Sequence, residues 1–108
     1  MYSAGKLTGI SGHFAGNVFS LRDGCEITIG RSAETADVVY GSYDNSISRR
    51  HCTVSYDGKS DTYIITDHST KGTYSAEGIR FPLEQKVKAA PGTLLVFGRN
   101  RSEIFRVG

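Results

Sequence analysis

The stretch Ser48-Arg49-Arg50-His51-Cys52-Thr53-Val54 carries the strongest signal in the sequence. A hydroxyl and two guanidinium groups directly precede a strand-like run, so they lie at a loop tip held by a rigid scaffold. Phosphate favours such groups, because its oxygens accept several charge-assisted hydrogen bonds at once. An Arg-Arg pair taken alone is most often a solvated pair of charges, so the neighbouring sequence has to decide.

Two further polar turns flank this stretch. Upstream, Ile27-Thr28-Ile29-Gly30-Arg31 ends an alternating strand with a glycine and then an arginine, which places another cation at a second loop tip. Downstream, Asp67-His68-Ser69-Thr70-Lys71-Gly72-Thr73-Tyr74 is a polar turn that contains a glycine and opens another short strand. We expect these three loops to converge at one end of a β-sandwich.

In this order, Gly30-Arg31, Ser48-Arg49-Arg50-His51 and residues 67–74 resemble the forkhead-associated (FHA) domain, whose pattern reads Gly-Arg, Ser-x-x-His and Ser-x-Asn-Gly-Thr. The closing strand at residues 93–98 also matches, and the resemblance covers nearly the whole chain. It implies an all-β fold, a twisted β-sandwich of two mainly antiparallel sheets with binding loops at one end, formed by one domain over residues 1–108. It also implies a non-catalytic module that recognises phosphothreonine in partner proteins.

The resemblance implies that five residues bind the phosphopeptide: Arg31, Ser48, Arg49, Thr70 and Lys71. Arg31 stands where the family has its phosphate-binding arginine; otherwise it would be a surface arginine that covers aliphatic neighbours. Ser48 is expected to donate its hydroxyl to a phosphate oxygen, and the alternative is a serine that caps its own turn. Arg49 is expected to face the peptide, and Thr70 to approach the phosphothreonine or its backbone.

Lys71 is a departure from the family pattern, which usually has asparagine at this position. The asparagine amide both donates to and accepts from the main chain of the bound peptide, whereas lysine only donates. Three outcomes are open: Lys71 adds a third cation at the phosphate, it favours an acidic residue a few positions after the phosphothreonine, or the site has drifted towards weak or phosphate-independent binding. The first two together are favoured, because Arg31, Ser48 and Arg49 are all present.

Three residues are expected to support the site without binding the ligand: Gly30, His51 and Gly72. Gly30 lets a strand end sharply, and Gly72 holds a turn conformation that a side chain would oppose. His51 follows Ser48 by three positions, but no acidic residue is assigned to orient its ring, as a catalytic triad requires. We therefore predict a scaffold role for His51 and no enzyme activity.

Composition limits the remaining function classes. The chain has 108 residues with 38% hydrophobic and 22% charged residues, 13 glycines and 2 prolines, which is typical of one globular domain with many tight turns. A net charge of +2 is too small for a general nucleic-acid or membrane-surface footprint. Cys25 and Cys52 are interpreted as buried, reduced thiols of a cytoplasmic protein. No apolar run of membrane-spanning length occurs, and we expect neither membrane insertion nor a cofactor or metal.

Alternating apolar residues predict short strands and no helix. The expected strands are 7–14, 18–21, 25–29, 37–40 as an edge strand, 52–56, 63–67, 73–75, 79–81, 93–98 and 104–107, with 82–90 as a connection of little pattern. Many short strands with turns at this spacing indicate a sandwich or a barrel.

The favoured partner is a phosphothreonine-containing protein, the substrate of a Ser/Thr kinase, read by a module of a bacterial-type multidomain signalling protein. The alternative is a phospho-independent assembly domain that retains the scaffold, for example in a bacterial-type signalling or secretion machine, and Lys71 is its main support. A hydrolase or phosphatase ranks far behind, because no metal cluster, paired carboxylates or activated nucleophile can be composed from the sequence. Nucleic-acid binding is equally remote, because the cations do not form a stripe with interleaved aromatic residues.

Overall fold

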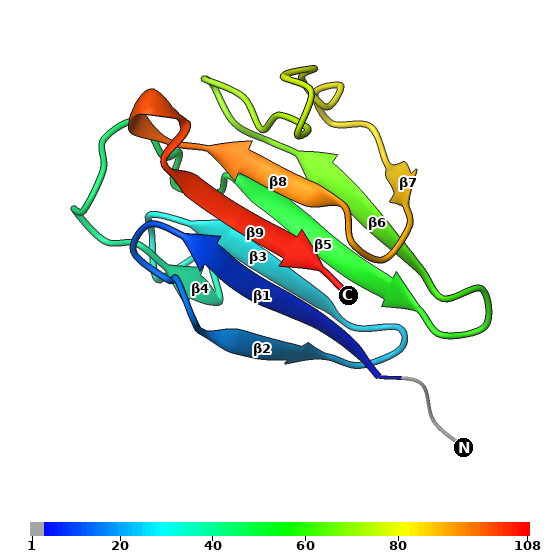
Figure 1. Ribbon diagram of the computed structural model, residues 1–108. Coiled ribbons are helices and arrows are strands. Elements are labelled where there is room, and N and C mark those ends of the chain that lie inside the picture. The colour runs from blue at the N-terminus through cyan, green and yellow to red at the C-terminus, as the bar shows by residue number, and fades with distance from the viewer. Residues whose placement is uncertain (1–3) are drawn as a thin grey trace.

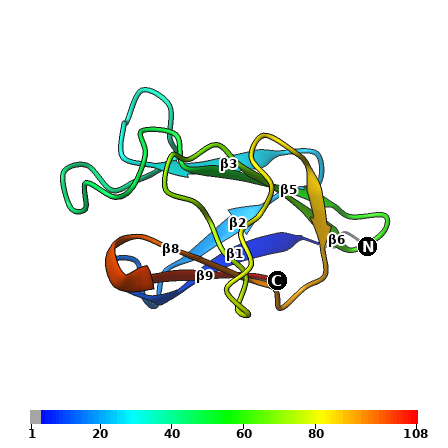
Figure 2. The same cartoon turned by 90° about the horizontal axis from the view of Figure 1, so that it is seen from above.

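Nine strands between residues 4 and 108, the part of the chain that the computed structural model describes, form two sheets packed face to face (Figures 1 and 2). The strands are β1 (Gly5–Ser11), β2 (Val18–Leu21), β3 (Glu26–Gly30), β4 (Val38–Val39), β5 (Cys52–Asp57), β6 (Thr62–Asp67), β7 (Val87–Ala89), β8 (Leu94–Phe97) and β9 (Glu103–Val107). A 3-10 turn, η1 (Arg99–Arg101), joins β8 to β9.

The smaller sheet has the strand order β2-β1-β9-β8, and the larger sheet has the order β4-β3-β5-β6-β7. All pairings are antiparallel except that of the two-residue edge strand β4 with β3. The first and last strands, β1 and β9, pair at the centre of the smaller sheet. The predicted all-β sandwich of two mainly antiparallel sheets is confirmed.

The core lies between the inner faces of the two sheets. Along β6, buried and partly buried residues alternate strictly, as expected for a strand with one face on the core. Ile65 from this strand is completely buried, as are Leu95 of β8 and Phe105 of β9 in the opposite sheet. Phe105 stacks parallel to Phe97, with ring centroids 5.9 Å apart. Burial of these apolar side chains, at about 25 cal/mol per Å² removed from water, holds the two sheets together.

Three local expectations differ from the structure. Strand β7 forms inside the segment expected to be a patternless connection, and it pairs with β6 at the sheet edge. Residues 73–75 and 79–81 do pair, with the N–H of Ser75 donating to Ile79 O and the N–H of Phe81 to Thr73 O, but they form an isolated bridge in place of two strands. Cys52 is buried as predicted, and burial raises the pKa of its thiol to about 12. Cys25 is exposed, because it lies in the turn before β3 and its N–H bonds to Arg22 O.

The loops that carry the candidate residues emerge together at one end of the sandwich. The β3–β4 loop follows Gly30, the β4–β5 loop precedes Cys52, and the segment after β6 begins at His68. Because β5 pairs with both β3 and β6, the ends of these three strands are neighbours, and their loops meet as expected. No helix within residues 4–108 is long and apolar enough to cross a membrane.

Candidate functional site

The β3–β4 and β4–β5 loops are joined directly by backbone hydrogen bonds. The N–H of Arg31 donates to Ser48 O at 3.0 Å, and the N–H of Ser32 donates to Arg49 O at 3.2 Å. The approach is so close that a Cβ added at Gly30 would lie 2.1 Å from Arg49 O. Glycine is therefore needed at position 30 for space, which gives a physical reason for the Gly-Arg pair in the sequence.

The side chain of Arg31 is held at the loop junction. Its Nε donates to the carbonyl oxygen of Ile47 at 3.0 Å, while the residue remains partly exposed. This hydrogen bond fixes the direction of the guanidinium group and leaves its two terminal nitrogens for other acceptors. No carboxylate within residues 4–108 forms an ion pair with it.

Ser48 occupies the centre of the three loops. Its Oγ accepts a hydrogen bond from the backbone N–H of Thr70 at 3.1 Å, which links the β4–β5 loop to the segment after β6. A hydroxyl can also donate one hydrogen bond, and within the described part of the chain Ser48 Oγ–H has no acceptor. The arrangement therefore presents one oriented O–H donor to an external acceptor.

His51 ties the same loops together from behind. The ring is completely buried, its Nδ1 accepts from the N–H of Ser48 at 3.0 Å, and its Nε2 lies 3.0 Å from Gly72 O. A ring nitrogen that accepts carries no proton, so Nε2 carries it and donates to Gly72 O. Burial lowers the pKa of His51, which favours this neutral form. Gly72 has a φ of 103°, a conformation that other residues rarely adopt.

The segment after β6 is organised around Asp67, a residue for which no individual role was predicted. Its carboxylate is completely buried; Oδ1 accepts from the N–H and Oγ of Ser69 and from Thr73 Oγ1, and Oδ2 accepts from Arg80. Ser69 Oγ in turn accepts from the N–H of Gly72 at 2.7 Å. A buried charge with this number of partners fixes the loop conformation, since breaking the network would leave unpaired polar groups inside the protein.

We call Arg31, Ser48, Thr70 and the supporting His51 the Ser48 cradle. Arg49 and Lys71 border it with exposed side chains, and neither forms an ion pair with a carboxylate of the described residues. The structure therefore brings the five candidate binding residues to one end of the sandwich, next to one another in connected loops. The cations around the hydroxyl donor are not neutralised from within these loops, which suits the cradle to an anion.

A second polar chain, which was not predicted, runs from Thr53 of β5 through His68, just after β6, to Glu84 in the connection that leads to β7. His68 Nε2 lies 2.8 Å from Thr53 Oγ1, and His68 Nδ1 lies 2.6 Å from Glu84 Oε1. The order of hydroxyl, imidazole and carboxylate is that of a hydrolase triad, but Thr53 is only 6% exposed. We interpret the chain as a tie between the sheet and the connection that leads to β7.

Taken together, the described residues form a β-sandwich with a hydroxyl donor and unpaired cations at one end, the architecture of a loop-based binding module. The family model of the FHA domain matches residues 27–98 of this sequence, and these residues contain the whole Ser48 cradle. The chain belongs to the FHA domain family. The family consists of non-catalytic binding modules. A comparison with curated proteins found no match.

Solved structures agree with this assignment at the level of the fold. The FHA domain of CT664 from Chlamydia trachomatis is similar with a TM-score of 0.78 at 24% identity, over 97% of this chain and 96% of that one. The N-terminal FHA domain of Rad53p from Saccharomyces cerevisiae, solved with a phosphothreonine peptide, gives 0.76 at 15% identity over 97% and 92%. The cytoplasmic domain of the type III secretion sorting platform protein PscD from Pseudomonas aeruginosa gives 0.69 at 17% identity over 98% and 80%.

Proposed function

We propose that this domain binds phosphothreonine in partner proteins through the Ser48 cradle. The observation that carries the proposal is the Ser48 hydroxyl, which is held by the Thr70 N–H while its own proton has no acceptor among the described residues. It lies in loops that also carry Arg31, Arg49 and Lys71 without carboxylate partners. A phosphate dianion supplies both the missing acceptor and the missing charge.

Each residue has a distinct task in this proposal. Arg31 and Ser48 bond to phosphate oxygens, and Arg49 adds charge or bonds to carbonyl groups of the peptide. Thr70 approaches the phosphothreonine, and Lys71 supplies a further cation at the rim. Gly30 and Gly72 support the site from the backbone. Solved FHA domains with phosphothreonine peptides bound, such as that of Rad53p, support a ligand of this class.

The same proposal suggests the setting in which the domain works. Its ligand is a protein phosphorylated on threonine by a Ser/Thr kinase, and the domain is a cytoplasmic module of a bacterial-type multidomain signalling protein. Both cysteines are free thiols in the structure, a pattern typical of reducing compartments.

The test is a titration with one degenerate peptide library in two forms, phosphothreonine and unmodified threonine, at two salt concentrations. We expect salt-sensitive binding of the phosphorylated form alone, because charge pairing is screened by salt. The double variant Arg31→Ala/Ser48→Ala should weaken this binding roughly 100-fold or more, since each charge-assisted hydrogen bond contributes about 1.5–3 kcal/mol.

The matched control removes the same two residue types far from the cradle. Ser20 of β2 and Arg22, just after β2, have exposed side chains, so Ser20→Ala/Arg22→Ala should leave both phosphopeptide affinity and thermal stability near those of the wild type. Binding that survives in a folded Arg31→Ala/Ser48→Ala variant would contradict the proposed placement of the site.

A second candidate function is phospho-independent assembly through a sheet face. The observation in its favour is that Ile10 of β1 and Val18 of β2 are 41% and 61% exposed on the smaller sheet. PscD, a protein of a secretion sorting platform, has a similar fold. Equal binding of the phosphorylated and unmodified libraries, or of a folded partner that is lost on Ile10→Ser/Val18→Ser, would support assembly instead.

A further inference from the structure

The outer faces of the two sheets differ in composition. On the larger sheet, the side chains that alternate with the core residues are mostly polar: Glu26, Thr28, Thr53, Ser55, Asp57, Thr62, Thr66 and Lys88, with Val39 and Ile64 as apolar exceptions. This composition is usual for the outer face of an antiparallel sheet, which meets water. The smaller sheet does not follow it.

Five apolar side chains lie on the outer face of the smaller sheet. The core residues of its strands, such as Leu95 and Phe105, point inward, so the positions that alternate with them point away from the core. Figure 1 looks onto this outer face, and no further strand or helix of residues 4–108 covers it. We call the five residues the apolar face: they are the exposed Ile10 and Val18 and the partly exposed Leu94, Val96 and Ile104.

The strand register places these side chains next to one another. Val96 of β8 pairs with Ile104 of β9, which pairs with Ser11 of β1, and Ile10 is the extra residue in the irregular pairing just before Ser11. The adjacent row across the four strands reads Val18, Thr8, Arg106 and Leu94. Cβ atoms of residues opposite one another in antiparallel strands lie about 4.5–5.5 Å apart. The five side chains therefore form one patch, and a contiguous apolar patch indicates an interaction surface.

The charged residues that point outward from this sheet are all basic. Lys6 of β1 and Arg106 of β9 border the apolar face, and neither forms an ion pair within residues 4–108. Glu103 is the acidic residue of the four strands, but it is completely buried and points to the core. The face therefore presents apolar side chains beside two cations that no outward-facing carboxylate of its strands neutralises.

Charge and shape together indicate the kind of partner. A second copy of this face would bring Lys6 and Arg106 near the same two cations, without a carboxylate to pair with either. A partner strand binds a sheet edge through its backbone, whereas the face of a sheet packs against the apolar stripe of a helix or against another sheet. The distance from β2 to β8 is three strand spacings, about 14 Å, which a helix of about ten residues spans.

We propose that the apolar face binds an amphipathic helix of another protein, whose apolar stripe covers Ile10, Val18 and their neighbours. Acidic residues beside that stripe pair with Lys6 and Arg106. The inference does not rest on phosphothreonine binding, because the apolar face lies on the strands and the Ser48 cradle on the loops. It gives the chemistry of the partner for assembly through a sheet face.

The test uses two designed, cross-linked helical peptides that share one leucine stripe, flanked by glutamate in one peptide and by lysine in the other. We expect the glutamate peptide to bind about tenfold more tightly, because attractive contacts with the two exposed cations replace repulsive ones. Amide chemical shifts in NMR spectra should change on β1, β8 and β9. The charge reversal Lys6→Glu/Arg106→Glu should reverse the preference.

The matched control reverses two cations away from the apolar face. Lys59 and Lys88 have exposed side chains, in the β5–β6 turn and on β7 of the larger sheet, so Lys59→Glu/Lys88→Glu should retain the preference for the glutamate peptide. The variant Ile10→Ser/Val18→Ser should lose most of the binding of either peptide. Its phosphopeptide affinity and thermal stability should stay near those of the wild type, because both side chains are exposed.

Several outcomes would overturn the inference, and none of them depends on the phosphothreonine titration. The glutamate peptide could leave the shifts of the apolar face unchanged, or the preference could survive Lys6→Glu/Arg106→Glu. A wild type that dimerises in analytical ultracentrifugation, while Ile10→Ser/Val18→Ser stays monomeric, would assign the face to a second copy of the chain. Binding to phosphatidylserine vesicles and to neither peptide would assign it to a membrane surface.

Discussion

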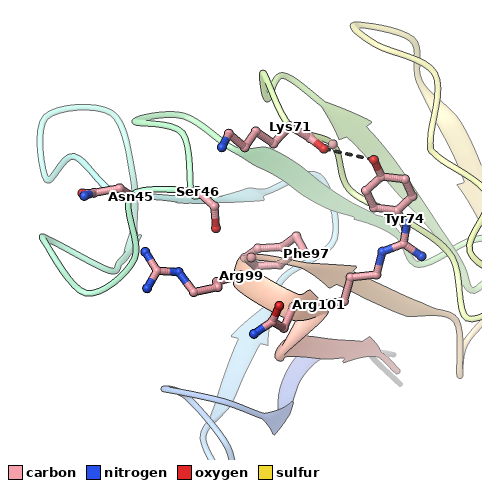
Figure 3. A pocket seen from close by; sticks show the side chains of 10 residues that line it. Asn45, Ser46, Lys71, Tyr74, Phe97, Arg99 and Arg101 are labelled. Atoms are coloured by element: carbon pink, nitrogen blue, oxygen red, sulfur yellow. Dashed lines mark hydrogen bonds between the residues drawn. The ribbon is translucent and has the colours of Figure 1, made fainter.

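The Ser48 cradle lies next to a second cationic site, the basic groove lined by Lys71, Tyr74, Arg99 and Arg101 (Figure 3). The two sites differ in how the protein holds their polar and charged side chains. In the cradle, the groups proposed to touch phosphate are themselves hydrogen-bonded to the protein: Ser48 Oγ to Thr70 N–H, and Arg31 Nε to Ile47 O. In the groove, Asp44 fixes the backbone of η1, while the charged tips of Lys71 and Arg99 have no ion-pair partner in the described chain. The comparison indicates that substitutions in the cradle should destabilise the fold. Substitution of the charged residues of the groove should have little effect on the free energy of unfolding.

The largest effect is expected from breaking the buried network under the cradle. Asp67→Ala leaves Ser69, Thr73 and Arg80 without their shared acceptor, and we expect the free energy of unfolding to fall by about 3 kcal/mol or more. That is a large part of the 5–15 kcal/mol typical of a domain. Urea denaturation measures this decrease in the free energy of unfolding. The groove counterpart Arg101→Ala loses an exposed cation–π contact with Tyr74 and should cost under about 1 kcal/mol; equal costs for both variants would remove the distinction.

A smaller effect is expected from His51, because it links two loops but carries no charge. His51→Ala leaves the N–H of Ser48 and the carbonyl of Gly72 without partners, and each unsatisfied buried group costs about 1–3 kcal/mol. We expect lower stability and a roughly tenfold loss of phosphopeptide affinity. His51→Gln can keep the donor to Gly72 and should recover part of both. Unchanged peptide affinity in a folded His51→Ala variant would show that the cradle does not depend on this link.

The pH dependence of stability gives a second test of the buried, neutral state of His51. Burial lowers the pKa of His51 in the folded state below the ordinary value of 6.5. The unfolded chain therefore binds a proton that the folded protein does not, and stability decreases as the pH falls from 6.5 towards the lowered pKa. The slope is at most about 1.4 kcal/mol per pH unit. The difference between the wild type and His51→Gln, measured by thermal unfolding between pH 7 and 5, isolates this contribution; parallel curves would contradict it.

The smallest effect is expected at the position shared by both sites. Lys71→Asn restores the family residue, removes one exposed cation and should leave stability within about 0.5 kcal/mol of the wild type. Because exposed ion pairs contribute about 0.2–1 kcal/mol, we expect at most a fivefold loss of preference for acidic peptides and a weaker salt dependence. Isothermal titration at two salt concentrations measures both. A loss of all phosphopeptide binding would instead place Lys71 at the phosphate itself.

The sequence predicted the parts of the fold that rest on local periodicity. The alternation in Ile27-Thr28-Ile29 and in residues 52–56 was sufficient to place β3 and β5, and their ends placed the candidate loops. β7 was missed because three residues carry too little periodicity to be distinguished from a loop. Cys25 was predicted to be buried because the alternation was extended one residue too far, into a turn.

The candidate site was predictable where one loop carries the whole motif, and not where side chains from distant segments meet. Nothing near Asp67 in the sequence indicates that Arg80, thirteen residues later, pairs with its carboxylate. Arg99 and Arg101 follow a strand in a polar turn, which is typical of solvated charges. Their place beside Lys71 depends on the packing of the two sheets, which only the folded chain determines.

The aromatic wall of the basic groove offers an optical probe of ligand binding. The chain contains no tryptophan, so Tyr74→Trp would introduce a single indole fluorophore directly under the guanidinium of Arg101. The intensity of its emission would change when an anion draws Arg101 away from the ring. It would not change when a ligand binds the Ser48 cradle alone. A fluorescence titration of this variant would therefore show whether a bound peptide reaches the Tyr74 and Arg101 side chains.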